Sequence, residues 1–327
     1  MDMEYRILGK TGLKVSVVGI GSLGFSRGGQ RDRGEEGLKE IAIIVNRALD
    51  LGINFIDTAY VYGRGTAEKG SGRVVKKRRK DCIILSRSNV WQTSNNPADT
   101  TRSLEESLRR LNTDVIDIYQ VHDVSAPGAY EKVIERGIYR ALEKAKEEGK
   151  VRFIGFSTHG STQMTKKMIE SGNIDVLTVA YNITHHRRGP EDGEDLSRTA
   201  QEIFPLTKKF NVGLTTMKPF GGGALLMAGH DGIKLSPPKI LRYVIENPYI
   251  ATVTPGVDNL QQLEQVIKAG SKDFSLSQEE IKKLEEEAKK WGKDFCRQCG
   301  YCLPCTAGIP IPQVMRLLMN WQNQNEK

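Results

Sequence analysis

Four cysteines near the C-terminal end of the sequence have the spacing of a cluster-binding or metal-binding segment. Cys296, Cys299, Cys302 and Cys305 fall within the run C-R-Q-C-G-Y-C-L-P-C. Consecutive C-x2-C steps bring four thiolates close enough to converge on one small object. Zinc is the alternative, since four thiolates also form a closed tetrahedral site. Zinc sites more often pair two C-x2-C units across a longer spacer, so the compact run favours a [4Fe-4S] cluster.

The cysteine content argues against a disulfide framework. Only 5 Cys occur in 327 residues, and Met1 is followed directly by charged sequence rather than by a signal peptide. We therefore expect a protein of the reducing cytoplasm. No stretch approaches the roughly 20 apolar residues that a membrane-spanning helix needs, so we expect no membrane partner.

A second group of reactive side chains follows short β-branched runs, at the point where each run ends. Asp57 ends one run and Tyr62 comes soon after it, Arg87 follows the next run, and His122 follows the third. If these runs are neighbouring parallel strands, their carboxyl ends meet at one edge, where barrel enzymes carry out their chemistry.

These residue types suit proton transfer to a carbonyl oxygen. A tyrosine, with an ordinary pKa of about 10, becomes a useful acid and base only beside a cation or hydrogen-bond donors. Arg87 can supply that charge, Asp57 can hold Arg87, and His122 can orient the substrate oxygen. Taken singly, each has a structural alternative, such as a loop cap, packing or a histidine satisfied within the core.

The elements that must position these residues alternate along the chain. β-branched runs are each followed by amphipathic segments of helical period, which is typical of parallel strands joined by crossover helices. The expected strands are Val17–Gly21, Asn54–Asp57, Cys82–Ser86, Asp117–Val121, Phe153–Ser157, Val176–Ala180, Val212–Met217 and Ile250–Val253. Among the expected helices are Leu38–Leu51, Thr100–Leu111, Val133–Glu148 and Asp195–Phe210.

Eight such units in a chain of 327 residues predict an α/β fold, a (β/α)8 TIM barrel, which needs about 250 residues. The opening segment, residues 5–15, indicates a hairpin with a glycine turn that covers the lower end of the barrel. We expect the barrel to occupy residues 1–275 and a helical, cysteine-rich extension to occupy 276–327. Helices are expected there over Gln278–Lys290 and Ile311–Trp321.

The net charge of +8 does not indicate a nucleic-acid partner. Much of it comes from Lys76-Lys77-Arg78-Arg79-Lys80, at the end of an expected helix and without interleaved aromatic residues. We interpret this run as a solvated helix end.

Several motifs together resemble the aldo-keto reductase family over roughly residues 3 to 270. They are Asp57-Thr-Ala-x-x-Tyr62-Gly63, Asp117-Ile-Tyr-Gln-Val-His122, Ile154-Gly-Phe-Ser157 and Met217-Lys218-Pro219-Phe220-Gly-Gly-Gly223. The resemblance implies the (β/α)8 barrel, a nicotinamide cofactor, NADP or NAD, and a small carbonyl or alcohol substrate. It makes Asp57, Tyr62 and His122 catalytic, with Tyr62 as the acid.

The fourth catalytic position of the family, normally lysine, falls on Arg87. Arginine stays charged, but its planar fork does not replace a compact ammonium. We expect Arg87 either to support Tyr62 or to bind an anionic substrate.

The resemblance also implies cofactor contacts. Ser22, Ser157, Thr158 and Thr178 correspond to residues that hold the nicotinamide end, and Lys218, Gly221 and Gly222 to a pyrophosphate segment. Met217, Phe220, Gly256 and Gln262 complete the set. No cation occurs between Thr254 and Gln262, and Asp258 would repel a 2′-phosphate there, which leaves the choice between NADP and NAD open.

A branch of the same family resembles the whole chain, including the four-cysteine segment, and implies an iron-sulfur cluster. The leading interpretation is a carbonyl reductase. Two alternatives remain open at this point: a nicotinamide-binding redox sensor or regulatory subunit with little turnover, and an electron-transfer protein that uses the cluster with a partner protein.

Overall fold

The computed structural model describes most of the chain. The described residues are 2–26, 34–126, 128–159, 162–186, 199–226, 235–290, 305–311, 313–315, 317 and 318. Within these residues no helix is long and apolar enough to cross a membrane.

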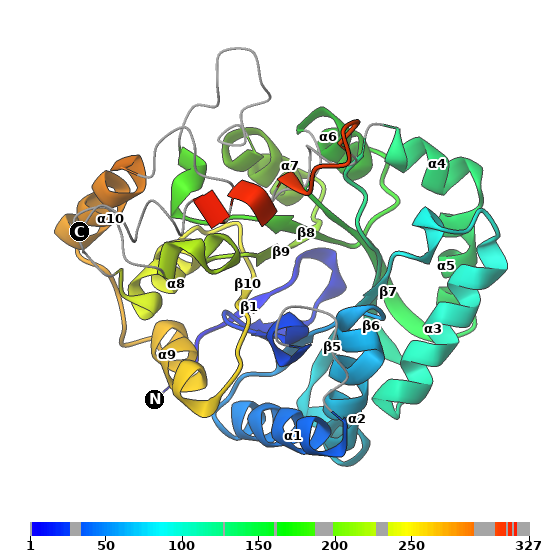
Figure 1. The fold of residues 1–327 in the computed structure, drawn as a ribbon, viewed down its shortest axis with the longest axis horizontal. Helices are drawn as coiled ribbons and strands as arrows, with labels where there is room; N and C mark the ends of the chain where they lie inside the picture. The colour runs from blue at the N-terminus through cyan, green and yellow to red at the C-terminus, as the bar shows by residue number, and fades with distance from the viewer. Residues whose placement is uncertain are drawn as a thin grey trace.

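The centre of the molecule is a closed barrel of parallel strands (Figure 1). Its eight strands are β3 (Ile20–Gly21), β4 (Phe55–Asp57), β5 (Ile83–Ser88), β6 (Ile116–Val121), β7 (Val151–Thr158), β8 (Val176–Ala180), β9 (Gly213–Met217) and β10 (Thr252–Thr254), each paired with the next. Parallel bridges from Val18 to Val253 and from Gly21 to Gly256 join the first strand region to the last. The expected (β/α)8 barrel is therefore confirmed.

The opening hairpin lies where the sequence predicts it. β1 (Tyr5–Ile7) pairs antiparallel with β2 (Lys14–Ser16). Buried side chains of the hairpin pack against residues near the amino ends of the barrel strands: Leu8, Leu13 and Val15 with Phe55, Ile118, Val176 and Ala251. At Gly9 a Cβ would lie 2.4 Å from the backbone nitrogen of Gly213, so the hairpin backbone meets the barrel directly.

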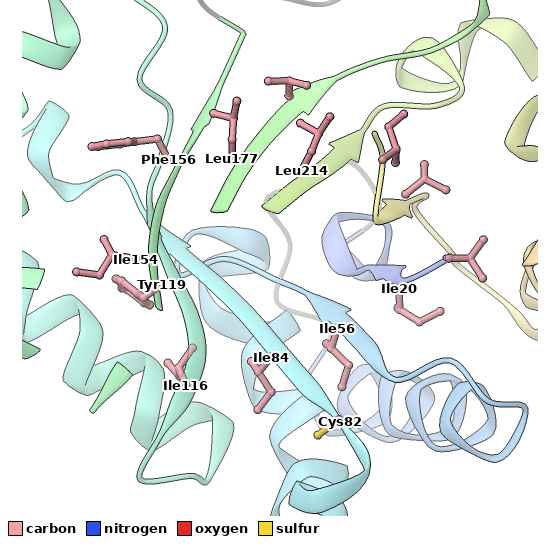
Figure 2. Packing of buried hydrophobic residues seen from close by; sticks show 14 of the residues in the cluster. Ile20, Ile56, Cys82, Ile84, Ile116, Tyr119, Ile154, Phe156, Leu177 and Leu214 are labelled. Atoms are coloured by element: carbon pink, nitrogen blue, oxygen red, sulfur yellow. The ribbon is translucent and has the colours of Figure 1, made fainter. Parts of the chain in front are cut away.

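Helices surround the strands on the outside (Figure 1). They are α1 (Gly34–Asp50), α2 (Thr66–Arg78), α3 (Pro97–Leu111), α4 (Ala129–Glu135), α5 (Ile138–Glu147), α6 (Thr162–Glu170), α7 (Phe204–Lys209), α8 (Pro237–Ile245), α9 (Leu260–Gly270) and α10 (Gln278–Lys290). Figure 2 shows outward strand residues such as Ile56, Ile84 and Ile154, which belong to the main buried apolar cluster between barrel and helices. Alternation of inward and outward side chains along each strand thus separates this cluster from the barrel interior.

One expected helix is divided in the structure. Val133–Glu148 was predicted as a single helix, but α4 ends at Glu135 and α5 begins at Ile138. Gly137 between them has a φ of 69°, which a continuing right-handed helix does not allow. The prediction was wrong because the apolar spacing continues across this break.

The described part of the C-terminal extension packs on the barrel's outer layer. Helix α10 has the bounds that the sequence predicts. Its buried residues Leu284 and Ala288 join Ile240 and Tyr243 of α8 in a second apolar cluster. Further along, residues 311, 313–315, 317 and 318 of the expected Ile311–Trp321 helix are helical, and its remaining residues lie outside the described part of the chain.

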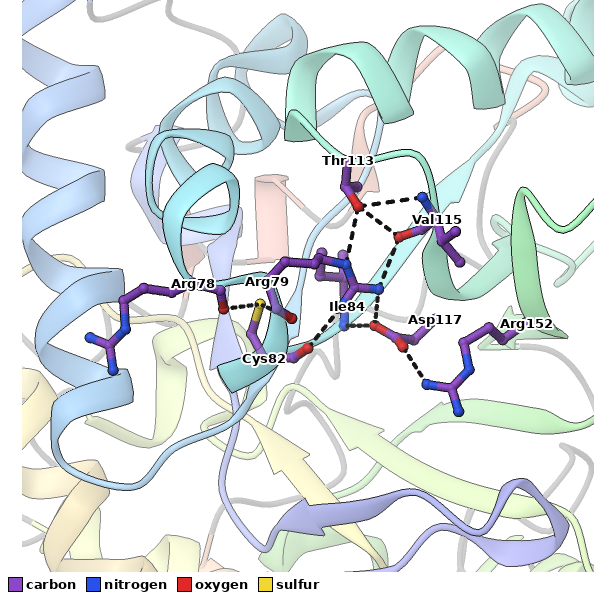
Figure 3. A network of polar contacts seen from close by, with 8 residues as sticks. All are labelled: Arg78, Arg79, Cys82, Ile84, Thr113, Val115, Asp117 and Arg152. Atoms are coloured by element: carbon purple, nitrogen blue, oxygen red, sulfur yellow. Dashed lines mark hydrogen bonds and ion pairs between the residues drawn. The ribbon is translucent and has the colours of Figure 1, made fainter.

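A polar network binds the beginning of β5 to its neighbours (Figure 3). The buried carboxylate of Asp117, on β6, accepts hydrogen bonds from the Ile84 backbone N–H at 2.9 Å and from Arg79 at 2.8 Å. Arg152 forms a second ion pair with it at 2.8 Å. The carboxylate therefore joins β5, β6 and β7 at one point.

We expect Asp117→Ala to lower the free energy of unfolding by about 3 kcal/mol, because it leaves the buried Ile84 N–H without an acceptor and removes the ion-pair partner shared by Arg79 and Arg152. Urea denaturation measures the change. The matched control is Asp81→Ala, whose carboxylate is 51% exposed and also pairs with an arginine, Arg78. An equal effect of the two substitutions would contradict this account.

Candidate active site

The barrel brings the four acid-base candidates together at its carboxyl edge. Asp57 ends β4, Arg87 lies in β5, His122 follows β6, and Tyr62 begins the 3-10 helix Tyr62–Gly65. Arg87 donates a hydrogen bond to Asp57, and the rings of Tyr62 and His122 meet edge to face with centroids 6.0 Å apart. Residues far apart in sequence thus form one group.

Asp57 and Arg87 form a buried ion pair. Arg87 is 1% exposed and Asp57 4%. Thr254 of β10 donates a hydrogen bond to the other carboxylate oxygen at 2.9 Å. Burial raises the pKa of Asp57, while the charge of Arg87 and the two hydrogen bonds oppose that rise. Because the guanidinium is so deeply covered, it is poorly placed to meet an anionic substrate from solvent.

The surroundings of Tyr62 and His122 favour their neutral forms. Burial raises the pKa of Tyr62 to about 12; Arg87 opposes the rise, and Asp57 and Asp123 add to it. Burial, together with the charges of Arg87 and Lys218, lowers the pKa of His122 to about 3. Near neutral pH the site therefore holds a protonated phenol beside an uncharged imidazole.

Two predicted cofactor residues present unused hydroxyl groups. Ser22, directly after β3, and Ser157, in β7, are fully buried. Neither hydroxyl has a hydrogen-bond partner in the described part of the chain. Other buried hydroxyls of the described residues, such as those of Thr58 and Ser71, also lack a partner. What distinguishes Ser22 and Ser157 is their place at the carboxyl ends of barrel strands, where a bound polar ligand would supply the missing hydrogen bonds. These two residues fit the expected nicotinamide cofactor.

Two other predicted cofactor residues use their hydroxyl groups within the protein. Thr158 donates to the Val124 carbonyl at 2.6 Å. Thr178 donates to the Gln120 side chain at 3.0 Å and shares a hydrogen bond of 2.7 Å with Thr215. Thr178 therefore belongs to a polar layer inside the barrel, below the edge that carries Tyr62.

The segment after β9 has the backbone freedom that the prediction requires. Lys218, Gly221 and Gly222 have φ values of 56°, 56° and 71°. Met217 is buried at the end of the strand and Phe220 is half-buried. The Lys218 carbonyl accepts hydrogen bonds from the Asn182 side chain at 3.2 Å and the Gly221 N–H at 3.0 Å, which stabilises this turn.

The last two predicted cofactor residues lie on the loop between β10 and α9. Gly256 is exposed and bridges to Gly21 across the barrel closure. The Gln262 side chain accepts a hydrogen bond from the Asp258 N–H at 2.7 Å, while the Gln262 N–H donates to the helix cap Asn259 at 2.9 Å. The loop is thus organised by its own polar contacts.

Sequence reasoning missed two residues that support this site. Thr254 holds Asp57, but the eighth strand was predicted to end one residue earlier, at Val253. Trp91, in a 3-10 helix after β5, donates from its indole nitrogen to the His122 carbonyl at 2.6 Å. No local pattern marks either contact, although the polar Thr254 at a strand end was a usable signal.

The cysteine segment is mostly outside the described residues. Cys296, Cys299 and Cys302 lie there, and Cys305 is partly buried. In the ranges that the structure describes, no three His, Cys, Asp or Glu residues are grouped so that they could hold a metal ion. The predicted cluster site is therefore not tested by the structure.

Comparison with known proteins identifies the family. A model of the Aldo/keto reductase family matches residues 18–240, more than half of the chain. The chain belongs to the aldo/keto reductase family. The match ends before the cysteine segment begins.

Similar curated proteins cover most of the chain. It is 28% identical over 316 residues to an uncharacterized oxidoreductase, YqkF, of Bacillus subtilis, which covers 88% of this chain and 97% of the relative. It is 28% identical over 317 residues to L-galactose dehydrogenase of Arabidopsis thaliana, covering 88% and 94%. A third relative is named "Probable voltage-gated potassium channel subunit beta", also of Arabidopsis thaliana. It is 27% identical, with 75% of this chain and 71% of the relative covered.

A solved aldo/keto reductase has a similar fold. The holo form of AKR11C1 from Bacillus halodurans superimposes with a TM-score of 0.68 at 25% identity, covering 88% of this chain and 97% of that one.

We expect substitutions of Arg87 and Asp57 in this aldo/keto reductase to have strongly coupled effects on the free energy of unfolding. Arg87→Met leaves a buried carboxylate without its cation, and Asp57→Asn leaves a buried cation without its carboxylate. Each substitution should therefore cost about 3–5 kcal/mol of unfolding free energy. The double variant should lose clearly less than the sum, as measured by urea denaturation.

The exposed pair Arg73 and Glu35, 2.6 Å apart, provides the control, and its double variant should show no resolvable coupling. Additive losses for Arg87 and Asp57 would contradict the description of these residues as one ion pair.

Proposed function

We propose that this chain transfers a hydride between a nicotinamide dinucleotide and a small carbonyl or alcohol substrate, with Tyr62 as general acid and base. The observation that carries the proposal is the convergence of the Tyr62 and His122 rings, 6.0 Å apart, with the buried Arg87–Asp57 pair at the carboxyl edge of the barrel. Aldo/keto reductases are NAD(P)-dependent oxidoreductases, and family membership supports the same reaction class.

The residues of the chain have distinct roles in this proposal. The bound cofactor supplies or accepts the hydride. Tyr62 donates its phenolic proton to the carbonyl oxygen in reduction and takes a proton from the alcohol in oxidation. Arg87 stabilises the phenolate electrostatically, since its charge lowers the pKa of Tyr62, and Asp57 holds Arg87 in place. His122, as a neutral imidazole, orients the substrate oxygen.

The cofactor is proposed to be NADP or NAD, with Ser22 and Ser157 holding the nicotinamide end. Their unpartnered buried hydroxyls support this placement. At the adenosine end, the residues from Thr254 to Gln262 include no lysine or arginine, and Asp258 is exposed there. A comparison of kcat/KM for the two reduced cofactors decides between them.

A regulatory role is the second candidate. One relative is named as a potassium channel subunit beta, and Arg87 replaces the lysine implied by the family resemblance. A sensor of this kind would bind the cofactor and turn over little substrate.

The four cysteines, Cys296, Cys299, Cys302 and Cys305, are proposed to bind one [4Fe-4S] cluster, with zinc as the alternative. The support is their donor set and spacing in the sequence. Thiolates of this kind stay available in a reducing compartment such as the cytoplasm. Iron, sulfide and zinc analysis of anaerobically purified protein separates the two. An electron-transfer partner would be implied only if the cluster were reduced during turnover.

Tyr62→Phe should lower turnover by about 100- to 10,000-fold, because it removes the proton donor and little else. A carbonyl panel that includes an aldose, chosen because one relative is an L-galactose dehydrogenase, measures the rate. Nicotinamide fluorescence should show unchanged cofactor binding. Tight binding without any turnover that depends on Tyr62 would instead support the regulatory role.

The two directions of reaction should depend on pH differently. Carbonyl reduction needs the protonated phenol, and with the Tyr62 pKa raised to about 12 and the His122 pKa lowered to about 3, its kcat/KM should be flat from about pH 5 to 9. Alcohol oxidation needs the phenolate and should rise with pH. A loss of reduction on the acid side between pH 5 and 7, removed by His122→Gln, would show that His122 titrates and contradict its neutral role.

A further inference from the structure

A buried carboxylate outside the barrel lies behind the candidate active site and has no role in the chemistry described above. Glu68, in α2, is fully buried. It accepts a hydrogen bond from the Ser86 hydroxyl of β5 at 2.7 Å and forms an ion pair with Arg110 of α3 at 3.3 Å. Burial raises the pKa of Glu68, and the contacts with Ser86 and Arg110 oppose the rise.

On one side of this network, Arg110 contacts the loop that carries Tyr62. Arg110 donates to the Tyr60 carbonyl at 3.2 Å, and its guanidinium carbon lies 4.5 Å from the centroid of the Tyr60 ring. A Cβ at Gly65 would lie 2.8 Å from the same guanidinium. The loop between β4 and α2 is therefore packed against Arg110 on both sides of Tyr62.

The Ser86 side of the network reaches the strand that carries Arg87. Ser86 and Arg87 are consecutive residues of β5, so their side chains point to opposite faces of the sheet. The Arg87 carbonyl in turn accepts the Tyr60 N–H at 2.8 Å. One carboxylate thus contacts, directly or through Arg110, both segments whose relative position sets the distance between Tyr62 and Arg87.

We propose that Glu68 is a positioning residue that holds the Tyr62 loop against β5. It thereby keeps the distance between the Tyr62 phenol and the Arg87 guanidinium fixed during proton transfer. The inference rests on the proposed function. A buried ion pair is weak evidence for stability, because an apolar replacement is often as stable. The contacts with both elements favour a geometric role instead.

The decisive variant is Glu68→Gln, assayed in the full-length protein for alcohol oxidation. We expect kcat to fall by about 10- to 100-fold, since small misplacements of reacting groups cost this much. Cofactor binding, measured by nicotinamide fluorescence, should change less than about twofold.

The pH profile separates positioning from simple loss of structure. The ionisable groups around Tyr62 are Arg87, Asp57, His122 and Asp123, and of these Arg87 lowers the pKa of Tyr62. When Arg87 moves away from Tyr62, its lowering effect on the Tyr62 pKa weakens. The rising limb of the oxidation profile should then move to higher pH by about half a unit or more. Because the Tyr62 pKa lies near 12, a limb that is scaled down looks the same as one that has moved to higher pH. Rates are therefore expressed per cofactor-binding site, counted by nicotinamide fluorescence, and a mere reduction in folded protein then leaves the limb unmoved.

Glu105→Gln is the matched control. Glu105 lies in α3 with Arg110 and pairs with Lys150 at 3.0 Å, but it is 51% exposed and makes no hydrogen bond to Arg110 or to the Tyr62 loop among the described residues. We expect a change of less than about threefold and an unmoved limb, because a surface ion pair contributes little. Ser86→Ala provides a milder second variant that removes only the β5 contact, and it should move the limb in the same direction.

The outcomes also separate this inference from the proposed function. Wild-type turnover that depends on Tyr62 establishes the function first. An unmoved limb in both Glu68→Gln and Ser86→Ala would then overturn the positioning role alone. If Glu68→Gln does not fold, Ser86→Ala decides by itself.

Discussion

The site depends on an ion pair that has almost no contact with water. Removing a carboxylate and a guanidinium from solvent is costly, and the cost is offset only when the two charges meet each other and their remaining polar atoms find partners. Asp57 meets this requirement through Arg87 and Thr254, which come from two different strands. The closed barrel is what brings those strands together, so the electrostatics of the site and the closure of the sheet depend on each other.

Strand β5 is held by three buried carboxylates along its length. Asp117 accepts the Ile84 N–H near the beginning of the strand, Glu68 accepts the Ser86 hydroxyl, and Asp57 pairs with Arg87 near its end. Each carboxylate also pairs with an arginine, so no charge is buried alone. Successive residues face opposite sides of the sheet, which lets one strand be fixed from the helical layer and from the interior at once. The position of Arg87 is therefore set by contacts on both faces.

The same low-polarity surroundings decide which forms of Tyr62 and His122 are present. Burial penalises the phenolate and the imidazolium alike, so the phenol keeps its proton and the imidazole stays neutral. The charge of Arg87 opposes burial at Tyr62 and adds to it at His122. One cation thus favours the phenolate at one residue and the neutral ring at the other, which is the combination that an acid-base tyrosine with an uncharged orienting partner requires.

The periodicity of the sequence was enough to predict the barrel, the opening hairpin and the residues at its carboxyl edge. Alternating strands and helices carry their own local signal, and parallel strands bring their ends to one edge whatever the loops do. That is why Asp57, Tyr62, Arg87 and His122 could be placed together before any coordinates were known. The break between α4 and α5 at Gly137 was not predicted, because the apolar spacing continues through it.

Only the tertiary structure showed that Thr254 donates a hydrogen bond to Asp57 and that the Thr178 hydroxyl is hydrogen-bonded inside the barrel. It also showed that Arg87 is buried rather than exposed to substrate. These facts depend on contacts between residues as much as 197 positions apart in the chain. Local patterns of hydrophobicity do not encode such contacts, because they form only when the sheet closes on itself.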